Sequence, residues 1–128
     1  MRRLLATGLL AVALVLPAAA VAGLPTLPLG KYSAKVGSPA QLKGTWVLDF
    51  LKGGKYTISD NGVVVVHGHL TSTSPTKIFM SNETGPAACP EFAVYAWKRS
   101  GRTLTLKKVV DDCAGRATVL ARPFKATG

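Results

Sequence analysis

The chain has 128 residues, a formal net charge of +10 and two cysteines. This length provides for one small domain and excludes a large multidomain enzyme. The Lys and Arg residues are scattered rather than gathered in one run, so the charge favours a soluble basic surface over a specific nucleic-acid site.

The first 22 residues have the three-part layout of a secretory signal peptide. Met1-Arg2-Arg3 is a short positive segment, residues 4–16 are almost wholly apolar, and Ala20-x-Ala22 supplies small residues for cleavage. We therefore expect residues 1–22 to be removed and the product to be secreted or otherwise extracytoplasmic, with no integral membrane segment. The alternative is an uncleaved anchor, because the apolar stretch is nearly long enough to span a bilayer.

Residues 23–30 contain two prolines among apolar residues and predict an extended N-terminal arm ahead of a domain at 31–128. From residue 31 the apolar pattern has period two, and no stretch keeps a helical period over three turns. Glycine-containing turns such as Asp60-Asn61-Gly62 separate the segments. The predicted strands span residues 31–36, 44–51, 55–59, 63–70, 77–81, 92–99, 103–110 and 116–122.

Strands joined in sequence order by short turns form an antiparallel meander, and eight of them are enough to close a barrel. We therefore predict an all-β fold, a single antiparallel up-and-down eight-stranded β-barrel. The alternative is an immunoglobulin-like sandwich, although Cys89 and Cys113 are too close in sequence for the framework of that fold.

The two cysteines predict one disulfide, because they form an even set in an exported chain. The predicted meander also places Cys89 and Cys113 at the same end of the barrel. A redox-active pair is the alternative, but the chain has no Cys-x-x-Cys spacing.

Gly44-Thr45-Trp46, at the head of the second predicted strand, resembles the Gly-x-Trp signature of lipocalins. Further short motifs are similar in order to those of small bacterial lipocalin-like exported proteins of the calycin superfamily: Gly30-x-Tyr32, Gly54-x-Tyr56, Tyr95-x-Trp97 and Asp112-Cys113-x-x-Arg116. The resemblance implies that Trp46 closes the barrel floor and packs under an arginine from a late strand, a part that falls here to Arg116. It also implies binding of a small apolar molecule.

The inward face of the predicted barrel is apolar, and its side chains either line a ligand cavity or simply fill the interior. The candidate residues are Leu48, Phe50, Tyr56, Ile58, Val64, Val66, Ile78, Met80, Tyr95, Trp97, Leu104 and Leu106. We expect a monomer that binds a small hydrophobic ligand. The alternative is a protein-binding module, such as a small exported protease inhibitor that uses the arm at 23–30.

Residues able to carry chemistry are few, and we predict a protein that is not an enzyme and has no cofactor. His67 and His69 project from one face of a predicted strand, but two ligands make an incomplete metal site, so we predict no metal and two solvated histidines. Asp111 and Asp112 lie in a predicted loop close to Arg116 and are typical of turn and capping residues.

Overall fold

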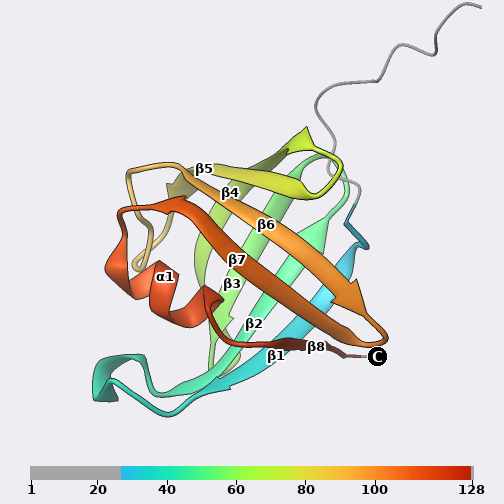
Figure 1. Cartoon of the computed structure of the whole chain (residues 1–128). Helices are drawn as coiled ribbons and strands as arrows, with labels where there is room; N and C mark the ends of the chain where they lie inside the picture. The colour runs from blue at the N-terminus through green and yellow to red at the C-terminus, as the bar shows by residue number, and fades with distance from the viewer. Residues whose placement is uncertain (1–26, 128) are drawn as a thin grey trace, which may run out of the picture.

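The computed structural model describes residues 27–127, so the predicted signal peptide and most of the predicted arm lie outside the described residues. Figure 1 shows a barrel of strands with one short helix packed against it. The elements, in chain order, are β1 (Gly30–Val36), the 3-10 helix η1 (Ala40–Leu42), β2 (Gly44–Leu51), β3 (Lys55–Asp60), β4 (Val63–Ser74), β5 (Lys77–Thr84), β6 (Ala93–Ser100), β7 (Thr103–Asp111), α1 (Ala114–Leu120) and β8 (Phe124–Ala126).

The eight strands form a closed barrel in sequence order, β1 to β8, and every neighbouring pair is antiparallel. This confirms the predicted fold class, an antiparallel up-and-down β-barrel compatible with a lipocalin-like fold. Among the residues described, no helix is both long and apolar enough to cross a membrane.

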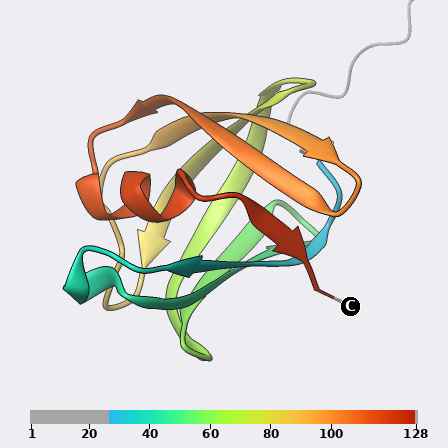
Figure 2. The same cartoon turned by 60° about the horizontal axis from the view of Figure 1, so that its bottom comes forward.

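The eighth predicted strand, at residues 116–122, is wrong, because the chain forms helix α1 there and the eighth strand follows at Phe124–Ala126. The buried residues of α1 are Arg116, Val119 and Leu120, which is a helical spacing of three and four. The helix has only seven residues, which is too short to show a helical period over three turns. Figure 2 shows α1 packed beside the barrel, ahead of the short β8.

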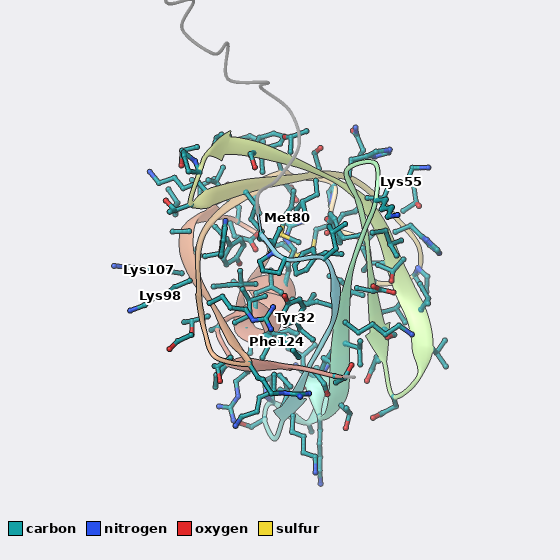
Figure 3. The ribbon with its side chains drawn as sticks, turned by 90° about the vertical axis from the view of Figure 1, so that its right-hand side faces the viewer. Tyr32, Lys55, Met80, Lys98, Lys107 and Phe124 are labelled. Atoms are coloured by element: carbon teal, nitrogen blue, oxygen red, sulfur yellow. A yellow bond between two sulfur atoms is a disulfide. The ribbon has the colours of Figure 1, made fainter. Side chains whose placement is uncertain are left out.

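Side chains fill the barrel interior. Figure 3 shows Tyr32, Met80 and Phe124 within the barrel, while Lys98 and Lys107 point away from it. Most of the predicted inward set is indeed buried: Leu48, Phe50, Tyr56, Ile58, Val66, Ile78, Met80, Tyr95, Leu104 and Leu106. The core is therefore packed by the same aromatic and aliphatic residues that were candidates to line a ligand cavity.

Two residues of that predicted set do not belong to the buried core. Val64 is 44% exposed, because the β3–β4 register shifts between Ile58 and Ser59. Ile58 pairs with Val66 but Ser59 pairs with Val64, so a bulge reverses the in-and-out alternation at this point. Trp97 is only partly buried and packs against the core.

The described end of the predicted arm packs on the barrel. Leu27 is 2% exposed and belongs to the hydrophobic core, and the Tyr32 hydroxyl donates a 2.8 Å hydrogen bond to the Pro28 carbonyl. Gly30, the last residue of that arm, already belongs to β1. Leu27 and Pro28 therefore contact the barrel, and Gly30 belongs to it.

The structure contains the predicted disulfide between Cys89 and Cys113. It links the β5–β6 connection to the residue that precedes α1. The bond therefore ties the helix to the end of the barrel where the β5–β6 loop lies.

Replacing both cysteines, Cys89→Ala with Cys113→Ala, should lower the free energy of unfolding by about 3.5 kcal/mol, the chain-entropy value for a closed loop of about 25 residues. Urea unfolding followed by circular dichroism measures this loss. The unmodified protein should lose a similar amount in reductant, while the double variant should not respond to reductant. Equal stability of the two proteins without reductant would contradict the expected role.

Candidate binding site under helix α1

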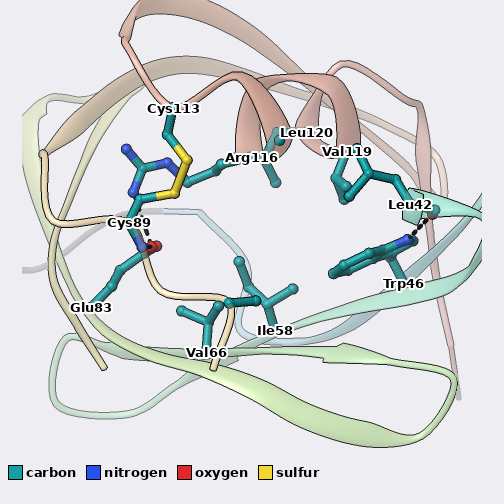
Figure 4. A pocket seen from close by; sticks show the side chains of 12 residues that line it. Leu42, Trp46, Ile58, Val66, Glu83, Cys89, Cys113, Arg116, Val119 and Leu120 are labelled. Atoms are coloured by element: carbon teal, nitrogen blue, oxygen red, sulfur yellow. Dashed lines mark hydrogen bonds and ion pairs between the residues drawn. A yellow bond between two sulfur atoms is a disulfide. The ribbon is translucent and has the colours of Figure 1, made fainter. Parts of the chain in front are cut away.

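A pocket of about 100 Å³ lies between α1 and the barrel. Figure 4 shows Val119 and Leu120 on its helix side, with Ile58 and Val66 facing them from the barrel. Its remaining lining residues are Leu42, Trp46, Glu83, Ala87, Cys89, Cys113, Gly115 and Arg116. Ile58 and Val66 are the members of the predicted ligand-lining set that reach it, so this is a site at one end of the barrel, outside its filled centre.

The position of Trp46 at one wall of the pocket depends on the close packing of Gly44 against a turn. Gly44 has φ +154°, and a Cβ there would lie 2.7 Å from Nδ2 of Asn61. The Asn61 side chain accepts a 2.9 Å hydrogen bond from the Thr45 N–H, and the Asn61 N–H donates to the Thr45 carbonyl at 2.9 Å. Glycine therefore lets the start of β2 dock on the β3–β4 turn and fixes the strand that carries Trp46.

The Trp46 indole is buried, and its Nε1 donates a 2.8 Å hydrogen bond to the Leu42 carbonyl. Because the polar atom of the ring has a partner in η1, the ring presents an apolar surface to the pocket. This accounts for the apolar character of the wall formed by Leu42 and Trp46.

Arg116 lies at the opposite end of the pocket, where it binds two carboxylates. Its guanidinium makes a bidentate contact with Asp111, at 3.0 Å from Nε and 2.8 Å from Nη2, and its Nη1 lies 3.0 Å from Oε1 of Glu83. Nη2 also donates to the Glu91 carbonyl at 2.9 Å. The three ionic side chains are at most 3% exposed, so this is a buried ion network.

The lipocalin resemblance implied that Arg116 stacks on Trp46, and the structure places Arg116 differently. It comes from α1 instead of a strand, and Figure 4 shows its guanidinium beside Glu83 and the disulfide, across the pocket from Trp46. Two buried carboxylates attract a guanidinium more strongly than an aromatic face does. The cation–π contact found within residues 27–127 is Arg99 over Tyr32, at 5.3 Å from the ring centroid.

Two tyrosines and the two cysteines complete the ion network. The Tyr95 hydroxyl donates to Asp111 at 2.5 Å, and the Tyr56 hydroxyl donates to Glu83. The backbone N–H of Cys113 donates to Asp111 at 3.0 Å, and that of Cys89 donates to Glu83 at 2.9 Å. Each carboxylate thus receives a guanidinium, a phenol and a cysteine amide, which satisfies the hydrogen-bonding needs of two buried charges.

Asp111 was predicted to be a turn or capping residue, and in the structure it has that role and a second one. It caps the turn through the Cys113 N–H, as expected, and it also forms the buried ion pair with Arg116. Burial raises the pKa of its carboxyl, but the hydrogen bonds from Arg116, Tyr95 and Cys113 outweigh that effect and hold the pKa below its ordinary value. Asp112 is exposed.

Glu83 was not singled out by the sequence, because simple alternation along β5 would turn it outward. Ile78 and Met80 are buried, so alternation would next bury Asn82. Asn82 instead has φ +52°, and the β4–β5 register shifts beside it, where His69 pairs with Ser81 but His67 pairs with Thr84. This bulge turns Glu83 inward, and an asparagine suited to positive φ is the signal that could have found it.

The Tyr56 hydroxyl reaches Glu83 because Gly68 leaves room for its ring. A Cβ at Gly68 would lie 2.3 Å from Cζ of Tyr56. The neighbouring His67 and His69 are exposed on the outer face of β4. In the described part of the chain, no group of three or more His, Cys, Asp or Glu is arranged to hold a metal ion.

Replacing Arg116 by methionine should lower the free energy of unfolding by about 3–5 kcal/mol, because it leaves two carboxylates buried without their cation. Arg122→Met is the matched control, since Arg122 is exposed and should contribute less than about 0.5 kcal/mol. Urea unfolding of both variants at neutral pH makes the comparison. Equal losses would show that the ion network does not hold α1 in place.

The pH dependence of stability should carry the signature of the buried tyrosines. Burial and the hydrogen bonds to Glu83 and Asp111 raise the pKa values of Tyr56 and Tyr95 far above their ordinary value. Their contribution is therefore complete below about pH 10 and is lost as the pH rises, since the phenols of the unfolded chain ionise first. For Asp111 the sign is opposite, and its contribution is lost as the pH falls below about 4.

Thermal unfolding of the wild type and of Tyr95→Phe between pH 7 and pH 11.5 tests this assignment. The wild type should lose stability more steeply above pH 10, by about 1.4 kcal/mol per pH unit for each tyrosine that stays protonated only in the folded state. Parallel pH profiles of the two proteins would rule out a buried, protonated Tyr95.

Comparison with known proteins finds no matching family model, no matching curated protein and no matching solved structure. The assignment of a function therefore depends on the barrel, the motifs and the geometry of the pocket.

Proposed function

We propose that this chain is an exported lipocalin-like protein that binds a small hydrophobic ligand, without catalysing a reaction. The observation that supports this proposal is the pocket between α1 and the barrel, whose walls are formed by Leu42, Trp46, Ile58, Val66, Val119 and Leu120. A concave apolar site with a few polar groups at one end is the usual form of a ligand pocket. The disulfide supports an oxidising, extracytoplasmic location.

The size of the pocket limits what it holds. Its volume of about 100 Å³ is below the roughly 300–1,000 Å³ of sites that enclose a whole drug-sized ligand. A cavity of about 150 Å³ holds one benzene molecule. We therefore infer that a ligand inserts a compact apolar group under α1, while any remaining part stays at the opening.

The charges at the end of the pocket limit the chemistry of that group. Two carboxylates and one guanidinium form the ion network, so it carries an excess of negative charge. All of its charged groups are already hydrogen-bonded or ion-paired with one another. The inserted group should therefore not be an anion, which would meet repulsion, whereas an apolar group would keep the network intact.

Protein binding, as by a small exported protease inhibitor, is the second candidate function. The filled barrel interior favours it, because buried side chains of the described residues occupy the space that a bulky ligand would need. Leu27 is anchored in the core while Leu29 is 48% exposed, so the described end of the predicted arm is held on the barrel. Inhibition of a panel of extracellular proteases by the mature protein, lost on removal of residues 23–26, would support this alternative.

Filling the pocket should weaken small-ligand binding. Gly115 lines the pocket, and a Cβ at this position meets nothing within 4 Å, so the fold should tolerate Gly115→Leu, and we expect the larger side chain to take up space at the pocket. Ala114→Leu is the matched control, since Ala114 is exposed on the same helix and does not line the pocket. The readout is the Trp46 indole N–H signal in NMR spectra.

The probes are benzene and the 1-alkanols from butanol to decanol. The wild type and Ala114→Leu should show saturable shifts of the Trp46 signal, and Gly115→Leu should bind at least about tenfold more weakly, as expected when the ligand's space is occupied. Native mass spectrometry of protein from its own host complements this by revealing a co-purifying molecule. No response of Trp46 to any probe would overturn the proposal of a small-ligand pocket.

A further inference from the structure

The barrel wall between β1 and β8 is only partly hydrogen-bonded. β1 pairs with β2 along its whole length, from Gly30 to Val36, but with β8 only at Tyr32 and Ser33. The cause is that β8 has three residues, with the turn after α1 in front of it. The last residues of β1 therefore form a short open edge that has no partner on β8.

The backbone of Lys35 faces this open edge. The Lys31 carbonyl accepts a 2.9 Å hydrogen bond from the Thr127 N–H, and residues two apart in a strand direct their backbone groups to the same side. Lys35 therefore faces the same way as Lys31. The bonds of Thr45, its partner on β2, support this orientation. Thr45 directs both its N–H and its carbonyl to Asn61, so neither group bonds to Lys35.

The residue opposite Lys35 cannot complete the ladder. Tyr32 pairs with Ala126 and Ser33 with Lys125, so the antiparallel register places Pro123 opposite Lys35. Proline has no backbone N–H to donate. The structure shows no hydrogen bond between the Lys35 backbone and the described residues on that side.

A basic groove of about 380 Å³ lies along this edge. Its charged lining residues are Lys35, Arg122 and Lys125, all exposed, and no acidic residue lines it. The ion pairs found within residues 27–127 are those of Arg116, so these three cations have no carboxylate partner there. The groove thus combines an unpaired strand backbone with an uncompensated positive charge.

We propose that this groove binds an extended, acidic polypeptide segment of a partner protein. The segment pairs its backbone with Lys35, as a short added strand, and places its carboxylates against Lys35, Arg122 and Lys125. Strand addition supplies affinity through main-chain hydrogen bonds, and charge complementarity selects the partner and speeds its association. The site is separate from the pocket under α1 and gives the protein-binding alternative a defined surface.

The test uses the mature protein, labelled with ¹⁵N, and a blocked hexapeptide of alternating Glu and Val. We expect saturable NMR shifts centred on the amides of Ser33, Lys35 and Lys125. A peptide with Lys in place of Glu tests the charge requirement, and one N-methylated at alternate positions tests the backbone pairing. Both peptides should bind at least about fivefold more weakly, and raising the salt should weaken the parent peptide.

Three variants locate the site on the protein. Arg122→Gln combined with Lys125→Gln should weaken the parent peptide by about fivefold or more, since two cations are lost from the groove. Lys55→Gln, an exposed lysine on β3, should leave binding unchanged. Gly115→Leu should also leave it unchanged, which separates this site from the proposed small-ligand pocket.

Four outcomes would overturn the proposal: no binding of the parent peptide, equal binding of the Lys peptide, equal binding of the N-methylated peptide, or equal effects of the double variant and Lys55→Gln. Vesicles of phosphatidylcholine with phosphatidylglycerol provide the last comparison. Vesicle binding that depends on Arg122 and Lys125, together with no peptide binding, would reassign the groove to an anionic membrane surface.

Discussion

The contact between Arg116 and its two carboxylates fixes helix α1 on the barrel. Asp111 comes from the end of β7 and Glu83 from the end of β5, so one guanidinium joins the helix to two strands that are not neighbours. The disulfide lies at the same place, since the amides of Cys89 and Cys113 donate to these two carboxylates. A covalent bond and an ion network thus hold the same junction, between α1 and the ends of β5 and β7. Their contributions to the free energy of unfolding should therefore be coupled, because each keeps the groups of the other in place.

Placing a helix where a full strand would otherwise close the barrel has two structural consequences. The helix covers one end of the barrel without filling it, which leaves the pocket bounded by Trp46 on one side and Arg116 on the other. It also delays the last strand until Phe124, so that β8 pairs with only part of β1 and leaves the Lys35 edge open. Both candidate binding surfaces therefore arise from the same seven-residue helix.

The sequence predicts the barrel well because its strands alternate clearly and its turns contain glycine and asparagine. The first seven strands follow from those patterns, and the Cys89–Cys113 bond follows from the even cysteine count and from the meander that places both cysteines at one end. The prediction fails where a local feature reverses the inward and outward alternation of a strand or forms a helix in its place. The alternation is reversed by the bulge that exposes Val64 and by Asn82, whose positive φ turns Glu83 inward. A short helix replaces the predicted strand at Ala114–Leu120. Each of these depends on tertiary packing, which a two-residue period does not encode. The ion network could not be predicted for the same reason, since it requires knowing which side chains the bulge at Asn82 and helix α1 bring together.

Because side chains fill the interior, the candidate binding sites lie at the wall and at one end of the barrel instead of at its centre. Tyr32, Phe50 and Phe124 occupy the centre, with Tyr32 and Phe50 in an edge-to-face contact at 5.8 Å between ring centroids. Opening a large internal cavity would require several such side chains to leave a close-packed core, at a cost of several kcal/mol for each. The pocket under α1 is already present, and the Lys35 edge already has unpaired backbone groups, so binding at either place requires no such rearrangement. Partners that join at the helix and at the open edge are therefore favoured over ligands enclosed within the barrel.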